Sequence, residues 1–453
     1  MTRVYPQFVV AKFGGTSVAD FDSMNRSASI VLADDHVRLV VLSASAGVTN
    51  LLVELSEGLE SRDRMDKIDT LRAIQHNIIS RLKSPSIIGK EIDQLLENIT
   101  RLSEKVWEAP SAALSDELVS HGELMSSLLF AEVLREREAQ AEWFDARKVI
   151  RTNSLYGCAE PNISQVEKQA EAHLRPRIEQ AIVITQGFIG SDDAGHTTTL
   201  GRGGSDYTAS LLGEALHAAR VDIWTDVAGI YTTDPRIVAQ AQRIDHISFS
   251  EASDMAAFGA KVLHPATLLP AMRKNIPVFV GSSKNTAAGG TLVRRETENP
   301  PLYRAIAVRR KQTLLRLHSL NAQPAYAFFA ETFAILAEHQ VDVDLVTTSE
   351  KGIALALNAT SSTSGEDNTL TTALLTALSA HCRVEIETGL ALVTLIGNQL
   401  HRNAGVCRDT FVELDAHCVR MICHGASNDN LCFLLPDDAA NDAVAALHRR
   451  LFE

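Results

Sequence analysis

The chain has 453 residues, of which 45% are hydrophobic and 22% are charged, and its formal net charge at pH 7 is −13. The length suggests two or three domains, and the composition is typical of a globular protein with a large core. The acidic balance argues against a nucleic-acid partner, because phosphate binding needs a basic surface.

The predicted elements begin with alternating strands and helices. Residues 8–11 (FVVA) and 37–42 (VRLVVL) are apolar runs of strand length, and residues 18–32 between them have helical spacing. Residues 51–147 are mostly helical in pattern. This order predicts an α/β domain with a doubly wound, mainly parallel sheet, which we expect to fill residues 1–298. Further predicted strands lie at 181–185, 221–224 and 277–280.

The pattern changes after residues 283–301, which are rich in turn-forming residues. Residues 299–388 contain one βαββαβ unit, and residues 389–453 contain a second that lacks its sixth element. An unassigned strand at 303–308 (YRAIAV) would complete the second unit, which would make the first an insertion within it. We therefore predict two ferredoxin-like modules after the α/β domain.

The first informative string is KFGGTS at residues 12–17, which follows the first predicted strand. Gly14 and Gly15 would let backbone N–H groups approach a phosphate, and the following helix N-terminus favours an anion. Lys12 would supply positive charge to a transferring phosphoryl group. A tight turn beside a solvated lysine is the alternative interpretation. The chain has no G-x-x-x-x-G-K-[ST], so it is not a P-loop enzyme.

The densest polar string is TTTLGRGGSD at residues 197–206. Its glycines permit close backbone approach, and Arg202 could grip a carboxylate with two parallel hydrogen bonds. Ser205 and Asp206 add polar contacts where a helix begins, and helix capping is their alternative role. We favour a binding function for this string.

Two weaker strings precede it. Residues 43–49 (SASAGVT) follow a predicted strand, where small hydroxyl groups suit a ligand crevice or cap the next helix. Glu123, within SHGE, could accept hydrogen bonds from a substrate ammonium group. A surface glutamate is the simpler interpretation of that residue.

Two more strings follow it. Within residues 224–236 (WTDVAGIYTTDPR), Tyr231 could contact an adenine ring and Arg236 could contact phosphates. A polar turn is the alternative. Residues 258–265 (FGAKVLHP) offer Lys261 as a second lysine for phosphate charge.

Taken in order, KFGGTS, SHGE, TTTLGRGGSDYTA, WTDVAGIYTTDPR and FGAKVLHP resemble the aspartokinase family of the amino-acid kinase superfamily. The likeness continues to the C-terminus through HSL, VDLVTTSE, MICHGASNDNLCFLL and LFE, and it points to the monofunctional, lysine-sensitive class with tandem ACT modules. The resemblance implies ATP-dependent phosphorylation of the L-aspartate β-carboxylate to 4-phospho-L-aspartate. That reaction is the first step of the pathway to lysine, threonine and methionine.

The resemblance also implies residue roles. Lys12, Asp206 and Lys261 would be catalytic, with the two lysines stabilising the transferring phosphoryl group. Arg202 would bind the α-carboxylate of aspartate and Glu123 its α-amino group. Magnesium would arrive with ATP, largely on its phosphates, and no protein metal site is expected. The other substrate-binding residues would be Ser43, Thr49 and Ser205, and the nucleotide-binding residues would be Gly14, Gly15, Thr225, Asp226, Tyr231 and Arg236.

The regulatory half departs from the family pattern. Lysine-sensitive relatives carry serine and glycine where this chain has Ala325 and Ala327, just before Phe328. Lys351 adds a positive charge nearby, whereas Asp344 and Thr348 match lysine-contacting positions. We therefore expect weakened lysine feedback with intact kinase activity, and a homodimer or higher homo-oligomer paired through the modules.

Cysteine usage and apolar segments bear on the compartment. The six cysteines form no C-x-x-C pair, which argues against a disulfide framework or a zinc site. The first apolar run ends at Lys12, too short for a signal sequence, and no segment approaches the ~18 apolar residues that span a bilayer. We expect a cytoplasmic protein with no membrane partner.

Two alternatives remain open. The first is another kinase of the same fold that acts on glutamate, N-acetylglutamate or carbamate, against which SHGE and GRGGSDYTA argue. The second is a catalytically silent amino-acid sensor that uses only its ACT modules. Intact Lys12, Glu123 and Arg202 argue against a silent protein.

Overall fold

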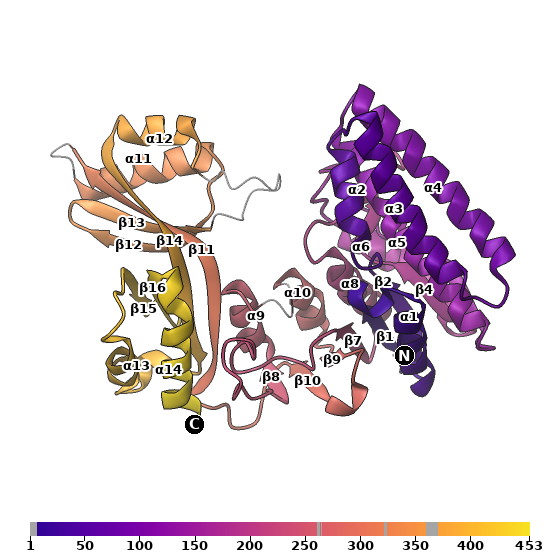
Figure 1. Ribbon diagram of the computed structural model, residues 1–453. Helices are drawn as coiled ribbons and strands as arrows, with labels where there is room; N and C mark the ends of the chain where they lie inside the picture. The colour runs from indigo at the N-terminus through magenta and orange to yellow at the C-terminus, as the bar shows by residue number, and fades with distance from the viewer. Residues whose placement is uncertain (1–6, 261–262, 264, 321–323, 359–369) are drawn as a thin grey trace. The chain divides into compact units, whose positions relative to one another are not determined.

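The computed structural model describes residues 7–260, 263, 265–320, 324–358 and 370–453 (Figure 1). The chain forms two compact units. The first unit holds Met1–Ile230, Arg243–Ser253 and Val262–Thr297, and the second holds Tyr231–Gln242, Asp254–Lys261 and Glu298–Glu453.

The first unit is built on an eight-stranded sheet with the order β3-β4-β2-β1-β7-β9-β10-β8. Neighbouring strands are parallel except for the antiparallel pair β9–β10. The predicted mainly parallel α/β sheet is therefore confirmed. The strands are β1 (Val9–Phe13), β2 (Val37–Leu42), β3 (Ala141–Phe144), β4 (Ile182–Gln186), β7 (Arg220–Thr225), β8 (His246–Ser248), β9 (Val278–Ser282) and β10 (Gly290–Arg294).

Helices pack on both faces of this sheet (Figure 1). Helix α5 packs on β2, β3 and β4 together with α1 to α4, whereas α8 packs on β1 and β7 together with α6 and α10. No helix within the described ranges combines the length and apolar character needed to cross a membrane. The helices are α1 (Phe21–Ala33), α2 (Val48–Ser56), α3 (Ser61–Ile79), α4 (Pro85–Glu108), α5 (Ala112–Arg135), α6 (Ile163–His173), α7 (Arg175–Ile178), α8 (Gly204–Leu216) and α10 (Pro265–Lys274), while α9 (Phe249–Ala257) begins in this unit and ends in the second.

Alternation along β1 decides which way its side chains point. Ala11 and Phe13 belong to the core that includes α5. Val10 instead lies near Gly213 of α8. Because successive side chains of a strand point to opposite faces, Lys12 points with Val10 towards α8.

One element differs from the sequence prediction. The stretch 51–147 was expected to be mostly helical, and α2 to α5 fill most of it. Its end instead forms the edge strand β3, whose four residues are too few for a strand period to stand out against the preceding helix.

The second unit contains a six-stranded antiparallel sheet with the order β12-β13-β11-β14-β16-β15. Helices α11 and α12 contribute to one apolar core, and α13 and α14 contribute to another. The predicted pair of βαββαβ modules thus shares one sheet. Its elements are β11 (Tyr303–Ser319), α11 (Ala325–Glu338), β12 (Val343–Ser349), β13 (Gly352–Asn358), α12 (Thr372–Ser379), β14 (Cys382–Gly397), α13 (Val406–Leu414), β15 (Met421–His424), β16 (Asn430–Pro436) and α14 (Ala440–Phe452).

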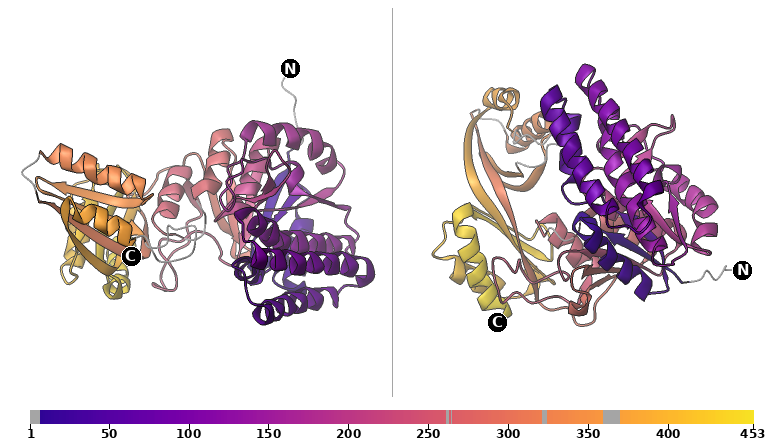
Figure 2. Two further views of the ribbon diagram at one scale, coloured as in Figure 1. Left: turned by 90° about the horizontal axis from the view of Figure 1, so that it is seen from above. Right: turned by 45° about the vertical axis from the view of Figure 1, so that its right-hand side comes forward.

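Two long strands run through both halves of this sheet. The strand expected at 303–308 does not end there but continues to Ser319 as β11, which has a register shift between Arg309 and Leu314 and a left-handed residue at Lys311 (φ 57°). Strand β14 is likewise continuous over 16 residues. Both strands curve along their length (Figure 2).

Residues 231–242 belong to the second unit, although the sequence analysis includes them in the α/β domain. The Thr232 carbonyl accepts a hydrogen bond from Ile306 N at 2.7 Å, and the Thr232 hydroxyl lies 2.9 Å from Nε2 of the buried His448. Val238 lies in the core beside α13 and α14. This segment is therefore held by the second unit's sheet and last helix.

Candidate active site

The candidate residues of the first unit gather at one edge of its sheet. Lys12 lies near the end of β1, Ser43 follows β2, and Thr225 ends β7. Strands β2, β1 and β7 are adjacent and parallel, so their carboxyl ends meet at the same edge. This is the usual position of ligands in open α/β sheets.

Lys12 forms an ion pair with Asp206 in the first turn of α8, and the Nζ–Oδ1 distance is 2.5 Å. The lysine is only 8% exposed. Its direction follows from the alternation along β1, which points it at α8. The pair holds an ammonium group in a buried position, where its charge acts more strongly than in water.

The structure shows that the glycines of KFGGTS serve close packing. The Gly14 N–H is already used, because it donates to the Trp224 carbonyl of β7 at 3.0 Å. A Cβ on Gly15 would lie 2.8 Å from the Ala44 carbonyl oxygen. Gly15 therefore has no room for a side chain beside the loop after β2.

Glu123 is buried, at 3% exposure, and not on the surface as its simpler interpretation proposed. Its Oε1 accepts a hydrogen bond from Ala44 N at 3.0 Å, while Oε2 has no hydrogen-bond partner within the described residues. Burial raises the pKa of Glu123 to about 8, against the opposing effect of the Lys12 charge. The free oxygen can bind a proton or accept a hydrogen bond from a ligand's ammonium group.

Helix α5 approaches the loop after β2 very closely. A Cβ on Gly122 would lie 2.8 Å from the Ala44 Cβ, and the Ser126 hydroxyl donates to the Ser43 carbonyl at 2.8 Å. Within the same loop, Ser45 is 1% exposed and its hydroxyl lacks a partner in the described part of the chain. Thr49 lies half-buried in the first turn of α2.

The loop before α8 has an unusual backbone. Gly201 and Gly203 have positive φ angles of 71° and 74°, which favour glycine. Arg202 between them is exposed and forms no hydrogen bond or ion pair with any described residue. Ser205 is buried, and its Cβ would lie 2.5 Å from a Cβ on Gly187. The loop thus presents a guanidinium group that has no partner in the protein.

Two serines at this edge are absent from the sequence-derived set. Ser17 and Ser283 are buried, and their hydroxyl oxygens are 2.6 Å apart. Ser283 also donates to the Thr225 carbonyl through its N–H at 2.8 Å and its hydroxyl at 3.1 Å. Thr225 in turn donates to Asp226 at 3.3 Å. The sequence signals for these two residues were the hydroxyl groups in KFGGTS and in GSSK at the end of β9.

The remaining predicted site residues are not in the described part of the first unit. Tyr231 and Arg236 belong to the second unit, where Arg236 pairs with Asp234 at 2.6 Å. Lys261 lies outside the described residues. The structure therefore brings together the first-unit candidates and says nothing of that second lysine.

The regulatory candidates lie in the second unit. Ala325 and Ala327 belong to the first turn of α11, and Phe328 is buried in the α11–α12 core. Asp344 pairs with Arg309 at 2.6 Å, while Thr348 is exposed.

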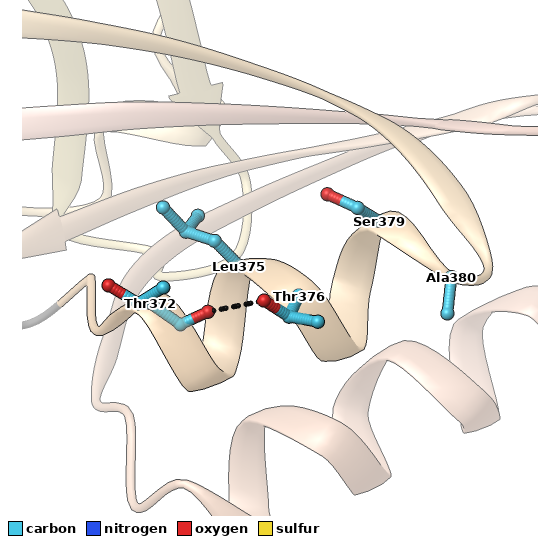
Figure 3. A pocket seen from close by; sticks show the side chains of 5 residues that line it. All are labelled: Thr372, Leu375, Thr376, Ser379 and Ala380. Atoms are coloured by element: carbon cyan, nitrogen blue, oxygen red, sulfur yellow. Dashed lines mark hydrogen bonds between the residues drawn. The ribbon is translucent and has the colours of Figure 1, made fainter.

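In the described part of the second unit, a groove is lined by uncharged residues. All of its lining residues come from α12 and the residue after it, and Thr376 donates only to the Thr372 carbonyl (Figure 3). Its lining is Thr372, Leu375, Thr376, Ser379 and Ala380.

Comparison with known proteins decides the family. Residues 7–282 match the amino acid kinase family, and residues 393–451 match an ACT domain. Lysine-sensitive aspartokinase 3 of Escherichia coli is 63% identical over 99% of this chain and 100% of its own length. The chain belongs to the aspartokinases.

Solved structures support the same relationship for this aspartokinase. The structure of Escherichia coli aspartokinase III with aspartate and ADP, in the R-state, has a TM-score of 0.93 and 63% identity, and covers 99% of this chain and all of that one. The T-state structure of that enzyme with lysine and aspartate has a TM-score of 0.84 and 62% identity, with the same coverage.

The raised pKa of Glu123 predicts a pH-dependent stability. Between pH 4.5 and about 8 the folded aspartokinase keeps a proton that the unfolded chain has released. The stability linked to this group is therefore complete below pH 4.5 and falls as the pH rises to about 8. The Glu123→Gln side chain cannot ionise. The melting temperature of this variant minus that of the wild type should therefore increase from pH 4.5 to about 8, as measured by thermal unfolding followed by circular dichroism.

The exposed Glu97→Gln is the matched control, and its melting temperature should stay parallel to the wild type. Parallel curves for Glu123→Gln as well would contradict the assignment of a buried, protonated carboxyl group at this position.

Proposed function

We propose that this aspartokinase uses Lys12, Glu123 and Arg202 to transfer the γ-phosphoryl group of ATP to the β-carboxylate of L-aspartate. The products are 4-phospho-L-aspartate and ADP. The observation that supports this most strongly is the combination of three groups at one sheet edge. They are a buried ammonium group, a buried carboxyl oxygen without a partner in the described chain and a guanidinium group without one. The relative's structure with aspartate and ADP supports the same substrates here.

Each group meets one part of the substrate. Aspartate carries an ammonium group that suits Glu123 and an α-carboxylate that suits the fork of Arg202. Its β-carboxylate is already a nucleophile at neutral pH, so no covalent intermediate on the protein is needed. The remaining barrier is the repulsion between this carboxylate and the phosphate oxygens.

Lys12 offsets that repulsion. Asp206 holds its ammonium group in place before substrates arrive, so little reorganisation is needed at the moment of reaction. Magnesium bound to the phosphates would add positive charge to the same oxygens. Among the described residues, no group of three or more His, Cys, Asp or Glu is placed to hold a metal ion.

The placement of the reaction follows from the same family. We place it at the first step of the pathway to lysine, threonine and methionine, and the two alternatives from the sequence, another acid substrate or a silent sensor, are not favoured. The six cysteines are unpaired thiols, which supports a reducing, cytoplasmic compartment.

The expectation of weakened lysine feedback requires correction. The relative with 63% identity is lysine-sensitive, and its T-state structure contains lysine. Ala327 lies inside α11, where φ is negative and alanine is favoured over glycine, so the substitution costs no backbone strain. Lys351 lies in an exposed turn, where water and salt screen its charge. We therefore propose that lysine still binds the second unit and inhibits the kinase.

The first expected outcome concerns chemistry. With ATP, magnesium, L-aspartate and hydroxylamine, the protein should form aspartate hydroxamate. Lys12→Ala should lower kcat by about 10²- to 10³-fold, because its charge meets the transferring group. Arg202→Ala should instead raise KM for aspartate by roughly 10- to 100-fold, through lost hydrogen bonds to a charged group.

Lys90→Ala, at an exposed position on α4, is the control and should match the wild type in both constants. Full turnover by Lys12→Ala would rule out the role given to that lysine.

Lysine inhibition gives the second outcome. Lysine should inhibit hydroxamate formation in a saturable manner, and Asp344→Ala should weaken the inhibition by roughly tenfold or more, because a charged partner is lost. Asp342→Ala removes a nearby but exposed carboxylate and should leave the inhibition curve unchanged. A kinase that is insensitive to millimolar lysine would restore the expectation of weakened feedback.

We also propose that the aspartokinase is a homodimer or higher homo-oligomer. The sheet of the second unit has two edge strands, β12 and β15, and unpaired strand edges favour association. Sedimentation velocity across micromolar concentrations should give at least the dimer mass, and a monomer throughout that range would refute the proposal.

A further inference from the structure

Asp116 is a buried carboxylate in α5 that the proposed chemistry does not use. It is 4% exposed, and both of its oxygens accept from Gly157 N at 3.0 Å. Its Oδ2 also accepts from Thr199 N at 2.8 Å, and its Oδ1 accepts from the Thr199 hydroxyl at 2.9 Å. Burial raises its pKa while these donors oppose the rise. All of these donors come from two segments of chain far from α5 in sequence.

Both segments adjoin the loop that carries Arg202, one in sequence and the other in space. Thr199 is the last residue of strand β6 (Thr197–Thr199), and Arg202 follows three positions later. The Thr199 carbonyl accepts from Ala159 N at 2.8 Å, so the two segments are also joined directly. A Cβ on Gly201 would lie 3.2 Å from the Gly157 carbonyl oxygen. The backbone beside Arg202 therefore rests on the turn that Asp116 holds.

Arg202 itself has no side-chain partner in the described chain, so its backbone sets its position. An exposed, partnerless guanidinium group binds a carboxylate in two parallel hydrogen bonds only if its loop is held firmly. Through Gly157 and Thr199, Asp116 is placed to give the loop that support.

Helix α5 also carries Glu123, seven positions after Asp116, which is about two helical turns. The α-carboxylate and α-ammonium groups of an amino acid are attached to the same carbon atom. The groups that bind them must therefore keep a fixed separation, and small errors in placement are costly. One rigid helix that holds Glu123 directly and the Arg202 loop through Asp116 would fix this separation.

We propose that Asp116 is a positioning residue for aspartate recognition, acting through Thr199 and Gly157 on the loop that carries Arg202. The inference rests on the proposed function, because it assumes that Arg202 binds the α-carboxylate. Asp116 thereby becomes part of the substrate specificity of the kinase rather than of phosphoryl transfer.

The test compares kinetic constants of full-length variants. Asp116→Ala should raise KM for aspartate by roughly 10- to 100-fold while KM for ATP stays within about twofold. Asp116→Asn should restore most of the affinity, because its oxygen can still accept from the N–H groups and its amide can donate to the Thr199 hydroxyl. Thr199→Val loses one hydrogen bond and should raise KM for aspartate by roughly three- to tenfold.

Asp222→Ala is the matched control. Asp222 is also a buried aspartate of the first unit, but its hydrogen bonds and ion pair go to Arg220 on β7. This variant should lower the melting temperature without a selective rise in KM for aspartate. A general loss of stability and a specific loss of positioning are thereby separated.

Combination with Arg202→Ala separates the two ideas. In that background, Asp116→Ala should add little further increase in KM for aspartate, since its effect passes through Arg202. If Arg202→Ala alone leaves KM for aspartate unchanged, the proposed role of Arg202 is wrong. Suppose instead that Arg202→Ala raises KM for aspartate. The positioning role is then wrong if Asp116→Ala leaves KM for aspartate unchanged, or if Asp116→Ala raises KM for aspartate and KM for ATP equally. Should Asp116→Ala fail to fold, an unchanged KM for aspartate in Thr199→Val overturns the proposal.

Discussion

The close packing of helix α5 against the loop after β2 is the contact on which the candidate site depends. Ala44 lies at its centre. The chain can approach Ala44 from both sides only because Gly15 and Gly122 have no side chains, and a Cβ on either would lie 2.8 Å from an Ala44 atom. The same approach brings Glu123 to the Ala44 N–H and removes its carboxyl group from water. The burial that raises the pKa of Glu123 is thus a consequence of two glycines.

This packing contributes to the charge balance of the candidate site. Lys12 and Asp206 neutralise each other, and the raised pKa keeps Glu123 largely protonated at neutral pH. Among the described first-unit candidates, Arg202 is a positive charge without an ion pair, and it favours the first contact with an anionic group. A ligand ammonium near Glu123 would favour its ionised form and release a proton, because an opposite charge lowers the pKa of a buried carboxyl group. The site can therefore recognise a zwitterion without holding a buried, unpaired carboxylate in its absence.

The sequence was sufficient to predict the sheet and the strings that end its strands. Short apolar runs followed by glycines are patterns of neighbouring residues, so they can be recognised without knowing the fold. It was insufficient for Glu123, whose burial depends on Ala44, 79 positions away. Asp116 carried no signal either, since a single aspartate in a helix is usually solvated. Ser17 and Ser283 are similar, because their contact joins residues 266 positions apart. Local patterns predict which groups are available, whereas tertiary contacts decide which of them are buried.

The second unit shows the same limit at the level of whole elements. Residues 309–314 look like a break between strands, yet the strand continues because a left-handed Lys311 and a register shift absorb the irregularity. Both β11 and β14 therefore cross from the α11–α12 core to the α13–α14 core, and residue 388, where one module was expected to end, falls inside β14. A shift in the register or twist of either strand would be felt in both cores, since close-packed interiors transmit strain. Because they share these strands, the two modules of this aspartokinase are mechanically coupled. A ligand bound at the first module would therefore act on the second through β11 and β14.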